Sequence, residues 1–170
     1  MLGNLLGVAV RGGVLAAALL VLDMPPAADK PVVGAMAPDA TIVLFDGSKV
    51  RLADLRGKVV ILNLWATWCG PCKREMPALD LMQVNAGKHG LQIYGVLVQD
   101  PTPRYRLRDL EKVLHYPLAR SVNKGLVPLD GAVPTNYIID RKGVIRYARA
   151  AVLDKEEFAE LIVPLINERP

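Results

Sequence analysis

Residues 65–77 read WATWCGPCKREMP, and this stretch decides the fold. Just before it, residues 59–65 hold the apolar run VVILNLW, which is typical of a strand buried on both faces of a parallel or mixed sheet. After the cysteines, apolar residues recur at helical spacing from Met76 through Leu79 to Met82. The sequence therefore predicts a buried strand that leads directly into a helix of about residues 69–86, with the cysteines at the junction.

The two cysteines of the chain, Cys69 and Cys72, lie in this strand-to-helix turn. Free backbone N–H groups and the macrodipole at a helix N-terminus stabilise a thiolate. The pKa of Cys69 is therefore expected to fall from the ~8.5 of a free thiol toward the ~7 of thioredoxin-type sites. One helical turn places Cys72 close enough to form a disulfide with Cys69 but deeper in the fold. We therefore expect Cys69 to attack and Cys72 to resolve, with Gly70-Pro71 keeping the turn tight.

A metal site and an inert structural bridge are the two alternatives to redox chemistry for this cysteine pair. A zinc site needs about four ligands, and with no third cysteine the only two histidines, His89 and His115, would both have to converge on the site although both lie outside the turn. A disulfide between residues three apart closes too small a ring to add much stability, so a purely structural bridge is also disfavoured. The sequence predicts no metal and no cofactor beyond a redox-active Cys69–Cys72 disulfide.

The rest of the folded part alternates strand and helix patterns. A hairpin is predicted around Asp46-Gly47, and a second central strand at residues 91–98 makes a β-α-β unit with the first. The remaining predicted elements are a helix at 104–114, a short strand at 118–120, a hairpin of residues 135–140 with the strand after Gly143, and an amphipathic helix at 154–167. The fold class is therefore α/β, a central mixed sheet flanked by helices.

The N-terminus carries the apolar run GGVLAAALLVL at residues 12–22, after a single positive charge at Arg11. Its length suits the core of a signal peptide, whereas a membrane anchor of about 20 residues would have to include Arg11. The sequence leaves a cleaved signal peptide and a signal anchor open for residues 1–22. We expect a proline-rich linker at 23–38 and one domain at 39–170.

The charge balance excludes one class of partner. The 21 basic and 17 acidic residues give a formal charge of +4, without a long run of one sign. The three arginines at 104, 106 and 108 alternate with other residues and fit a solvated helix edge better than a basic face for nucleic acid. No nucleic-acid partner is predicted.

The motif WCGPC at the end of a buried strand, with Pro77 five residues after the second cysteine, resembles thioredoxin. With the preceding ILNLWAT and the following KREMP, it is more similar to the exported TlpA/ResA/DsbE branch of that superfamily. The resemblance covers about residues 35–168 and implies a thioredoxin-like fold with two additions, the N-terminal β-hairpin and a helix-strand insertion at about 104–120. It also implies a redox activity and an extracytoplasmic, periplasmic location.

The resemblance also assigns residues around the cysteines. Val133-Pro134 precedes the strand at 135, and the matching proline of the family is cis, packs on the disulfide and offers backbone groups to a substrate chain. Trp68, next to Cys69, is expected to form part of an apolar rim for the substrate. The predicted substrate-binding residues are Trp68, Gly70, Pro71, Val133 and Pro134.

A proton acceptor for Cys72 is predicted at Glu75. Thioredoxin has a buried aspartate six residues before its first cysteine, where this chain has Asn63. Glu75 lies three residues after Cys72 on the same helical face and matches an acidic residue of the exported reductases. A partly buried carboxyl has a raised pKa and can accept the thiol proton. The alternative is a surface glutamate that the helix dipole favours in the first turn.

These features predict a protein-disulfide reductase. By resemblance, its partners would be disulfide-containing exported proteins, with apocytochromes c or copper-site proteins as clients and a membrane thiol carrier as electron donor. The first alternative is a periplasmic disulfide donor, which a redox titration would distinguish. A thioredoxin-fold copper chaperone is disfavoured because it would show CxxxC with a distal histidine, and a peroxidase because no distant resolving cysteine is present.

Overall fold

The computed structural model describes residues 31–168, and its centre is one mixed sheet of seven strands. The strands lie in the order β2-β1-β5-β4-β3-β6-β7. Their bounds are β1 Thr41–Leu44, β2 Lys49–Arg51, β3 Val59–Trp65, β4 Leu91–Leu97, β5 Leu118–Val122, β6 Thr135–Ile139 and β7 Ile145–Arg149. β3, β4 and β5 run parallel to one another, and the remaining neighbours pair antiparallel. This is the predicted mixed sheet of a thioredoxin-like fold.

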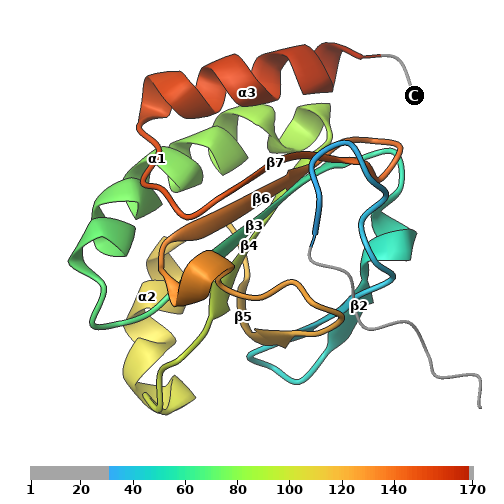
Figure 1. The fold of residues 1–170 in the computed structure, drawn as a ribbon. Helices are drawn as coiled ribbons and strands as arrows, with labels where there is room; N and C mark the ends of the chain where they lie inside the picture. Colours follow the sequence, from blue (N-terminus) through green and yellow to red (C-terminus); the bar gives the residue numbers. More distant parts are fainter. Residues whose placement is uncertain (1–30, 169–170) are drawn as a thin grey trace, which may run out of the picture.

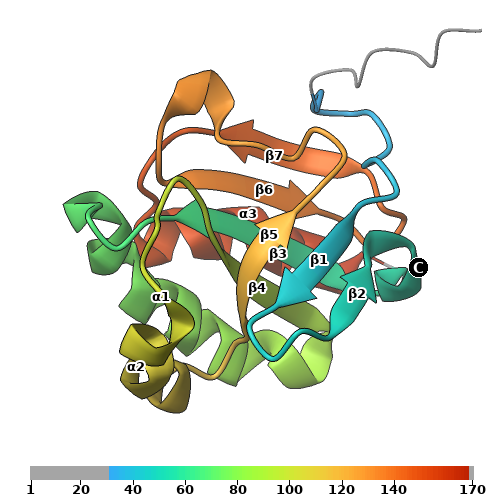
Figure 2. The same ribbon diagram turned by 90° about the horizontal axis from the view of Figure 1, so that it is seen from below.

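Two long helices cover one face of the sheet. They are α1, Gly70–Ala86, and α3, Lys155–Asn167, and they lie side by side in Figure 1. The apolar side chains between them and the sheet include Trp65, Leu79 and Phe158, each almost fully buried. Figure 2 views the molecule with α3 behind the strands. The helix that carries the cysteines is therefore fixed to the sheet along its buried side.

The second core lies on the opposite face of the sheet. Tyr94 and Tyr137 are buried there with Leu62 and Leu64 of β3. Leu52, from the short 3₁₀ turn η1, Leu52–Leu55, covers part of this face. β3 is buried at all seven positions because it has a core on each side.

The predicted N-terminal hairpin is present as β1 and β2. Gly47 takes a φ of +90°, which a glycine adopts without a steric penalty. The Asp46 carboxylate accepts the Ser48 backbone N–H at 2.8 Å and so holds the turn. Because β1 also pairs with β5, the hairpin extends the central sheet.

The insertion between β4 and β6 differs from the single helix predicted at 104–114. A 3₁₀ turn η3, Arg104–Leu107, leads into a short α2, Arg108–Val113. β5 follows and is two residues longer than the predicted strand at 118–120. In Figure 1, α2 lies near the lower end of α1. The remaining short 3₁₀ turns are η2, Gly87–His89, and η4, Leu129–Gly131.

Residues just before position 39, the predicted start of the domain, contact the β6–β7 hairpin. Met36 pairs with Val144, and the Ala37 backbone N–H donates to the Gly143 carbonyl at 2.8 Å. These bonds satisfy backbone groups beside β7 and bury Ala37. The predicted export segment, 1–22, and the first part of the predicted linker lie outside the described residues. Within residues 31–168, no helix is long and apolar enough to cross a membrane.

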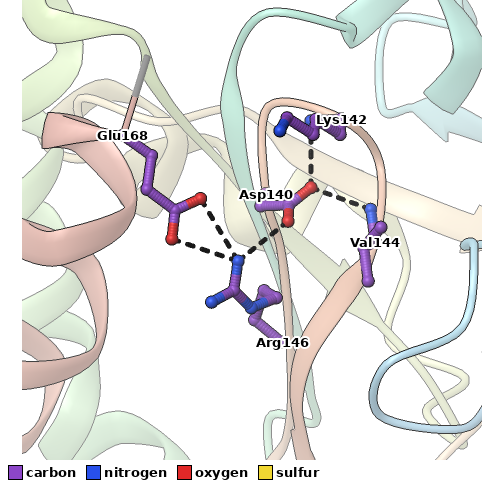
Figure 3. A network of polar contacts seen from close by, with 5 residues as sticks. All are labelled: Asp140, Lys142, Val144, Arg146 and Glu168. Carbon is purple, nitrogen blue, oxygen red and sulfur yellow. Dashed lines mark hydrogen bonds and ion pairs between the residues drawn. The ribbon is translucent and has the colours of Figure 1, made fainter. Parts of the chain in front are cut away.

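The predicted C-terminal hairpin and helix are joined by charged side chains. Asp140 accepts the backbone N–H groups of Lys142 and Val144, each at 2.9 Å, and so closes the β6–β7 turn (Figure 3). Arg146 of β7 donates to Asp140 at 3.1 Å and to Glu168, just after α3, at 3.1 and 3.2 Å. Figure 3 shows that the guanidinium lies between the two carboxylates. The hairpin and the end of α3 are thereby held together, far along the chain from the cysteines.

Candidate active site

Cys69 and Cys72 are joined in a disulfide at the N-terminus of α1. Cys69 is the N-cap residue, and its Sγ accepts the Cys72 backbone N–H at 3.1 Å. The residue Cys69 is 3% exposed, whereas Cys72 is completely buried. When the disulfide opens, the same N–H group and the helix dipole stabilise a thiolate on Cys69. The order of exposure agrees with Cys69 as the first sulfur that a substrate reaches.

The loop before β6 lies against the first cysteine. The Val133–Pro134 peptide bond is cis, as the resemblance implied. The Val133 carbonyl oxygen lies 3.6 Å from the Cys69 Sγ. Pro134 is buried, while Val133 is half-buried. The geometry therefore places a backbone strand end beside the sulfur where a substrate chain would bind.

Trp68 forms an exposed wall beside Cys69. Its side chain is 62% exposed, although its Nε1 donates to the Gln99 carbonyl at 3.2 Å. Gly70 is also exposed, and Pro71 is half-buried. By contrast, Trp65 is buried in the core, as predicted. Of the predicted substrate-binding residues, Trp68 and Gly70 are therefore accessible, Pro71 and Val133 are partly so, and Pro134 is buried.

Glu75 is almost completely buried, with 1% of its surface exposed. Its Oε1 accepts from the Asn63 Nδ2 at 2.5 Å, and its Oε2 accepts from the Asn136 Nδ2 at 3.3 Å and the Leu153 backbone N–H at 3.2 Å. The two asparagines also contact each other, at 2.9 Å between the Asn63 Nδ2 and the Asn136 Oδ1. The alternative of a surface glutamate is therefore wrong, because β3, β6 and the segment before α3 enclose this carboxyl.

Burial raises the pKa of Glu75 to about 7, and the hydrogen bonds from Leu153, Asn63 and Asn136 only partly oppose that rise. Desolvation penalises the ionised carboxylate more than three donors can compensate. Near neutral pH the group therefore exists in both protonation states. On a helix, residues three apart are neighbours, so Glu75 lies one turn beyond Cys72.

The role of the asparagines was missed by the sequence analysis. Asn63 was interpreted only as the loss of an acceptor, and Asn136 was not singled out. A signal was present for Asn63, the lone polar residue in the buried strand VVILNLW, and a weaker one for Asn136, which follows Thr135 in the buried strand TNYII. A buried amide requires hydrogen-bond partners, and residues on adjacent strands can supply them. Asn63 and Asn136 are in fact directly opposite in the β3–β6 register.

The other polar residues near the motif lie apart from the disulfide. Lys73 and Arg74 are exposed on α1. The His115 Nδ1 lies 2.9 Å from the Asp80 Oδ2, and this pair ties the insertion to α1. In the part of the chain that the structure describes, no group of three or more His, Cys, Asp or Glu side chains is arranged to hold a metal ion.

An apolar groove of about 540 Å³ lies between α1 and the insertion. Its floor is Trp65 and Met76, and its far wall is formed by η3 and α2. Thr67 and Lys73, on either side of the cysteines, line the end nearest the motif. The surface around the disulfide therefore continues into an apolar depression.

Fold and site together define a thioredoxin-like protein with a CxxC disulfide at a helix N-terminus, the class that carries out thiol-disulfide exchange. The chain belongs to the AhpC/TSA family, whose model matches residues 33–148. The thiol-disulfide oxidoreductase ResA of Geobacillus thermodenitrificans is 32% identical over 130 residues, which cover 75% of each chain. The thioredoxin-like protein YneN of Bacillus subtilis is 31% identical over 130 residues, 75% of this chain and 76% of YneN.

Solved structures agree with this assignment. The thiol:disulfide interchange protein DsbE of Chlorobium tepidum has a TM-score of 0.69 and 30% identity, covering 81% of this chain and 100% of that one. A secreted thiol-disulfide isomerase of Corynebacterium glutamicum has a TM-score of 0.67 and 26% identity, covering 77% and 85%. The predicted ResA/DsbE-like fold is confirmed, and the chain is a thiol-disulfide oxidoreductase.

Proposed function

We propose that the enzyme reduces disulfides of exported proteins, with Cys69 and Cys72 as its redox couple and Glu75 as the proton acceptor. The observation that carries the proposal is a disulfide at the N-terminus of α1 with a carboxyl buried one helical turn beyond Cys72. The reducing direction is supported by the dipeptide Gly70-Pro71, which thioredoxin shares.

The first step is attack by the Cys69 thiolate on a sulfur of the client disulfide. A bond forms between the Cys69 Sγ and that sulfur, while the client S–S bond breaks. The other client sulfur leaves as a thiolate and takes up a proton from solvent. The N-terminus of α1 stabilises the attacking thiolate, since the Cys72 backbone N–H points at Sγ and the helix dipole favours negative charge there.

The second step releases the client. The buried Cys72 thiol gives its proton to the Glu75 carboxylate and attacks the Cys69 Sγ. The Cys69–Cys72 disulfide forms as the bond between Cys69 and the client breaks, so two electrons have moved from the enzyme to the client. The second client sulfur departs as a thiolate. A pKa of about 7 suits Glu75 to this exchange, because the carboxyl gains and loses a proton near neutrality.

The client chain would bind across the exposed side of the disulfide. Trp68 would pack on its apolar side chains, while Gly70 and Pro71 leave the approach to Cys69 unobstructed. The Val133 carbonyl, 3.6 Å from the Cys69 Sγ, is placed to accept a backbone N–H from the client, next to Pro134.

We place this activity outside the cytoplasm. The apolar run at 12–22 supports export, with residues 1–22 as a signal peptide or an anchor to the inner membrane, 23–38 as a linker and the catalytic domain following. A membrane thiol carrier would return two electrons to the Cys69–Cys72 disulfide after each cycle. Apocytochromes c and copper-site proteins are the proposed clients, since thiols must be reduced before they bind haem or metal.

The direction is tested by the equilibrium redox potential of the purified protein in glutathione or dithiothreitol buffers. A value near the about −270 mV of thioredoxin supports a reductase. A value near the about −120 mV of strong periplasmic oxidants would instead make the enzyme a disulfide donor. Cys69→Ser and Cys72→Ser serve as controls, because neither variant can form the internal disulfide.

The clients are tested with Cys72→Ser. This variant keeps the attacking thiol but cannot resolve, so each client should remain attached to Cys69 as a mixed disulfide. Trapped proteins are identified by mass spectrometry after non-reducing electrophoresis. Cys69→Ser is the matched control and should trap none. Trapped proteins without haem-binding or copper-binding cysteines would contradict the proposed client class.

A further inference from the structure

The segment that follows β4 contacts both loops that flank the disulfide. Gln99 and Asp100 come directly after this strand, which the Val98 backbone N–H extends by donating to the Trp65 carbonyl at 2.9 Å. One of the flanking loops, residues 66–68, leads into Cys69, and the other precedes the cis peptide at Pro134. A two-residue segment thus lies between the two parts of the proposed substrate site.

Asp100 holds the loop that leads into Cys69. Its Oδ2 accepts the Thr67 backbone N–H at 2.5 Å, and its Oδ1 accepts the Thr102 backbone N–H at 2.8 Å. The Thr67 and Thr102 hydroxyl oxygens lie 3.1 Å apart. Burial acts to raise the pKa of Asp100, but hydrogen bonds from the two threonines outweigh it and lower the pKa to about 2. The carboxylate is therefore charged, and both its oxygens are engaged, at any physiological pH.

Gln99 contacts both flanking loops. Its backbone carbonyl accepts the Trp68 Nε1–H at 3.2 Å, and its side-chain Nε2 donates to the Gly131 carbonyl at 3.4 Å. Its φ of +52° lies in the left-handed region, which is unfavourable for a residue other than glycine or asparagine. That conformation is maintained by bonds on three sides, from β4, Trp68 and Gly131.

A turn alone would not require this arrangement. The Asp100–Thr102 bond closes the turn by itself, as the Asp46–Ser48 bond does in the hairpin between β1 and β2. In addition, the Asp100 Oδ2 binds residue 67, and the Gln99 carbonyl and side-chain amide bind residues 68 and 131. These three residues are remote in sequence. Trp68 is exposed over 62% of its surface, yet its indole is fixed in orientation by this bond.

We propose that Gln99 and Asp100 are positioning residues. They hold the Trp68 side chain and the loop before Cys69 in a fixed position relative to the loop before Pro134, so that a polypeptide client can contact both loops. Asp100 fixes the backbone before Cys69, and Gln99 fixes the indole on one side and Gly131 on the other. Neither residue contacts the reacting sulfurs. The proposal rests on thiol-disulfide exchange itself and not on its direction.

The test compares two disulfides in Asp100→Ala, a peptide with an intramolecular disulfide and the small hydroxyethyl disulfide. Displacement of the two loops relative to each other should lower kcat/KM for the peptide by about tenfold, which is less than the 10²-fold that a 1 Å misplacement costs. The small disulfide touches little beyond Cys69, so its rate should fall less than about twofold, because thiolate stabilisation by the helix is retained. An equal fall for both disulfides, or none for either, would overturn the proposal.

The matched control is Asp46→Ala, which removes the same kind of turn bond far from the disulfide and should leave both rates unchanged. Asp100→Asn should retain part of the peptide rate, since one oxygen remains to accept either Thr67 or Thr102. Asn tolerates a positive φ but is too short to reach Gly131, so Gln99→Asn isolates the side-chain bond. It should also affect the peptide selectively, and a wild-type peptide rate would exclude Gln99 from the role.

Trp68 provides an independent measurement. Trp68→Phe keeps an aromatic wall but lacks the donor to the Gln99 carbonyl, so it should show the same selective loss with the peptide. In Asp100→Ala, the loosened Trp68 indole should show lower fluorescence anisotropy, measured against Trp68→Phe to subtract the signal of Trp65. Unchanged anisotropy of Trp68 would show that Asp100 does not hold this wall. Failure of wild-type protein to exchange with either disulfide would count against the proposed function instead.

Discussion

The Nδ2 of Asn63 lies 2.5 Å from the Oε1 of Glu75, a contact that joins the central strand β3 to α1 one helical turn beyond Cys72. The amide replaces water as the partner of the carboxyl, which is 1% exposed. Since an amide is neutral, it cannot compensate the charge of the carboxylate as a cation would. The site therefore holds a carboxyl whose proton affinity is high because of where the fold places it.

The first prediction concerns stability and pH. The pKa of Glu75 rises from 4.5 to about 7 on folding, so between these values the native state binds more protons than the unfolded state. The free energy of unfolding then falls as pH rises, and the contribution of this group is full below pH ~4.5 and lost above ~7. The expected loss is about 3 kcal/mol over the whole window, and denaturant unfolding of the oxidised protein at pH 5 and pH 8 would measure most of it.

Glu75→Gln is the comparison for this effect. The amide does not titrate, so the difference in unfolding free energy between pH 5 and pH 8 should shrink by most of that amount. Every other ionisable group is retained in the variant and cancels in the comparison. An unaltered pH dependence in Glu75→Gln would mean that the carboxyl does not change protonation in this range.

The second prediction concerns the release of the client. Without a proton acceptor, the buried Cys72 thiol ionises reluctantly, and the mixed disulfide on Cys69 should persist. Glu75→Gln should slow its resolution by about 100-fold, the lower end of what general acid–base catalysis contributes. Rapid-quench experiments with a peptide disulfide measure formation and decay separately. Formation should keep its wild-type rate, and a slowed formation step with normal decay would contradict the assigned role.

The third prediction tests how Asn136 tunes the carboxyl. Its Nδ2 donates to the Glu75 Oε2 and lowers the pKa of Glu75, partly opposing the effect of burial. Asn136→Ala should therefore move the pKa of Glu75 above about 7, since a donor to the ionised form is lost. Carboxyl ¹³C chemical shifts followed against pH report this pKa directly. A downward movement would mean that water enters the vacated space and hydrates the carboxylate.

Much of the fold could be predicted because its signals are local. The apolar run at residues 59–65, the Asp46-Gly47 turn and the amphipathic period of α3 each specify their element through nearby residues. Asp154 caps the N-terminus of α3 and forms a capping box with Glu157, also through nearby residues. Residues 34–37 show no periodic pattern of apolar residues. Their backbone hydrogen bonds go to residues 143–145, and a sequence pattern does not indicate partners so far along the chain.

The candidate site also combines residues that are close in sequence with partners that are distant in sequence. The cysteine pair and Glu75 lie within one helical segment, so their spacing indicated that they are neighbours. The partners of Glu75 are distant in sequence, with Asn136 61 residues away and Leu153 78 residues away. Asp100 and Thr67 meet only because β3 and β4 end side by side. Contacts of this kind depend on the sheet register, which the sequence alone did not provide.

The fourth prediction concerns Gly95, in the middle of β4. A Cβ there would lie 2.8 Å from the Leu118 Cδ2 and 3.1 Å from the Tyr116 Cε2, inside a packed core. Gly95→Ala should lower the free energy of unfolding by about 1–3 kcal/mol, because such overpacking displaces neighbours. In the control Gly87→Ala, the Cβ meets only the end of the Gln83 side chain, at 2.7 Å, and would disturb its bond with the Ile93 backbone N–H, so the change should cost about 1 kcal/mol at most. Urea unfolding measures both, and equal stability of the two variants would show that β4 can shift to admit a methyl group.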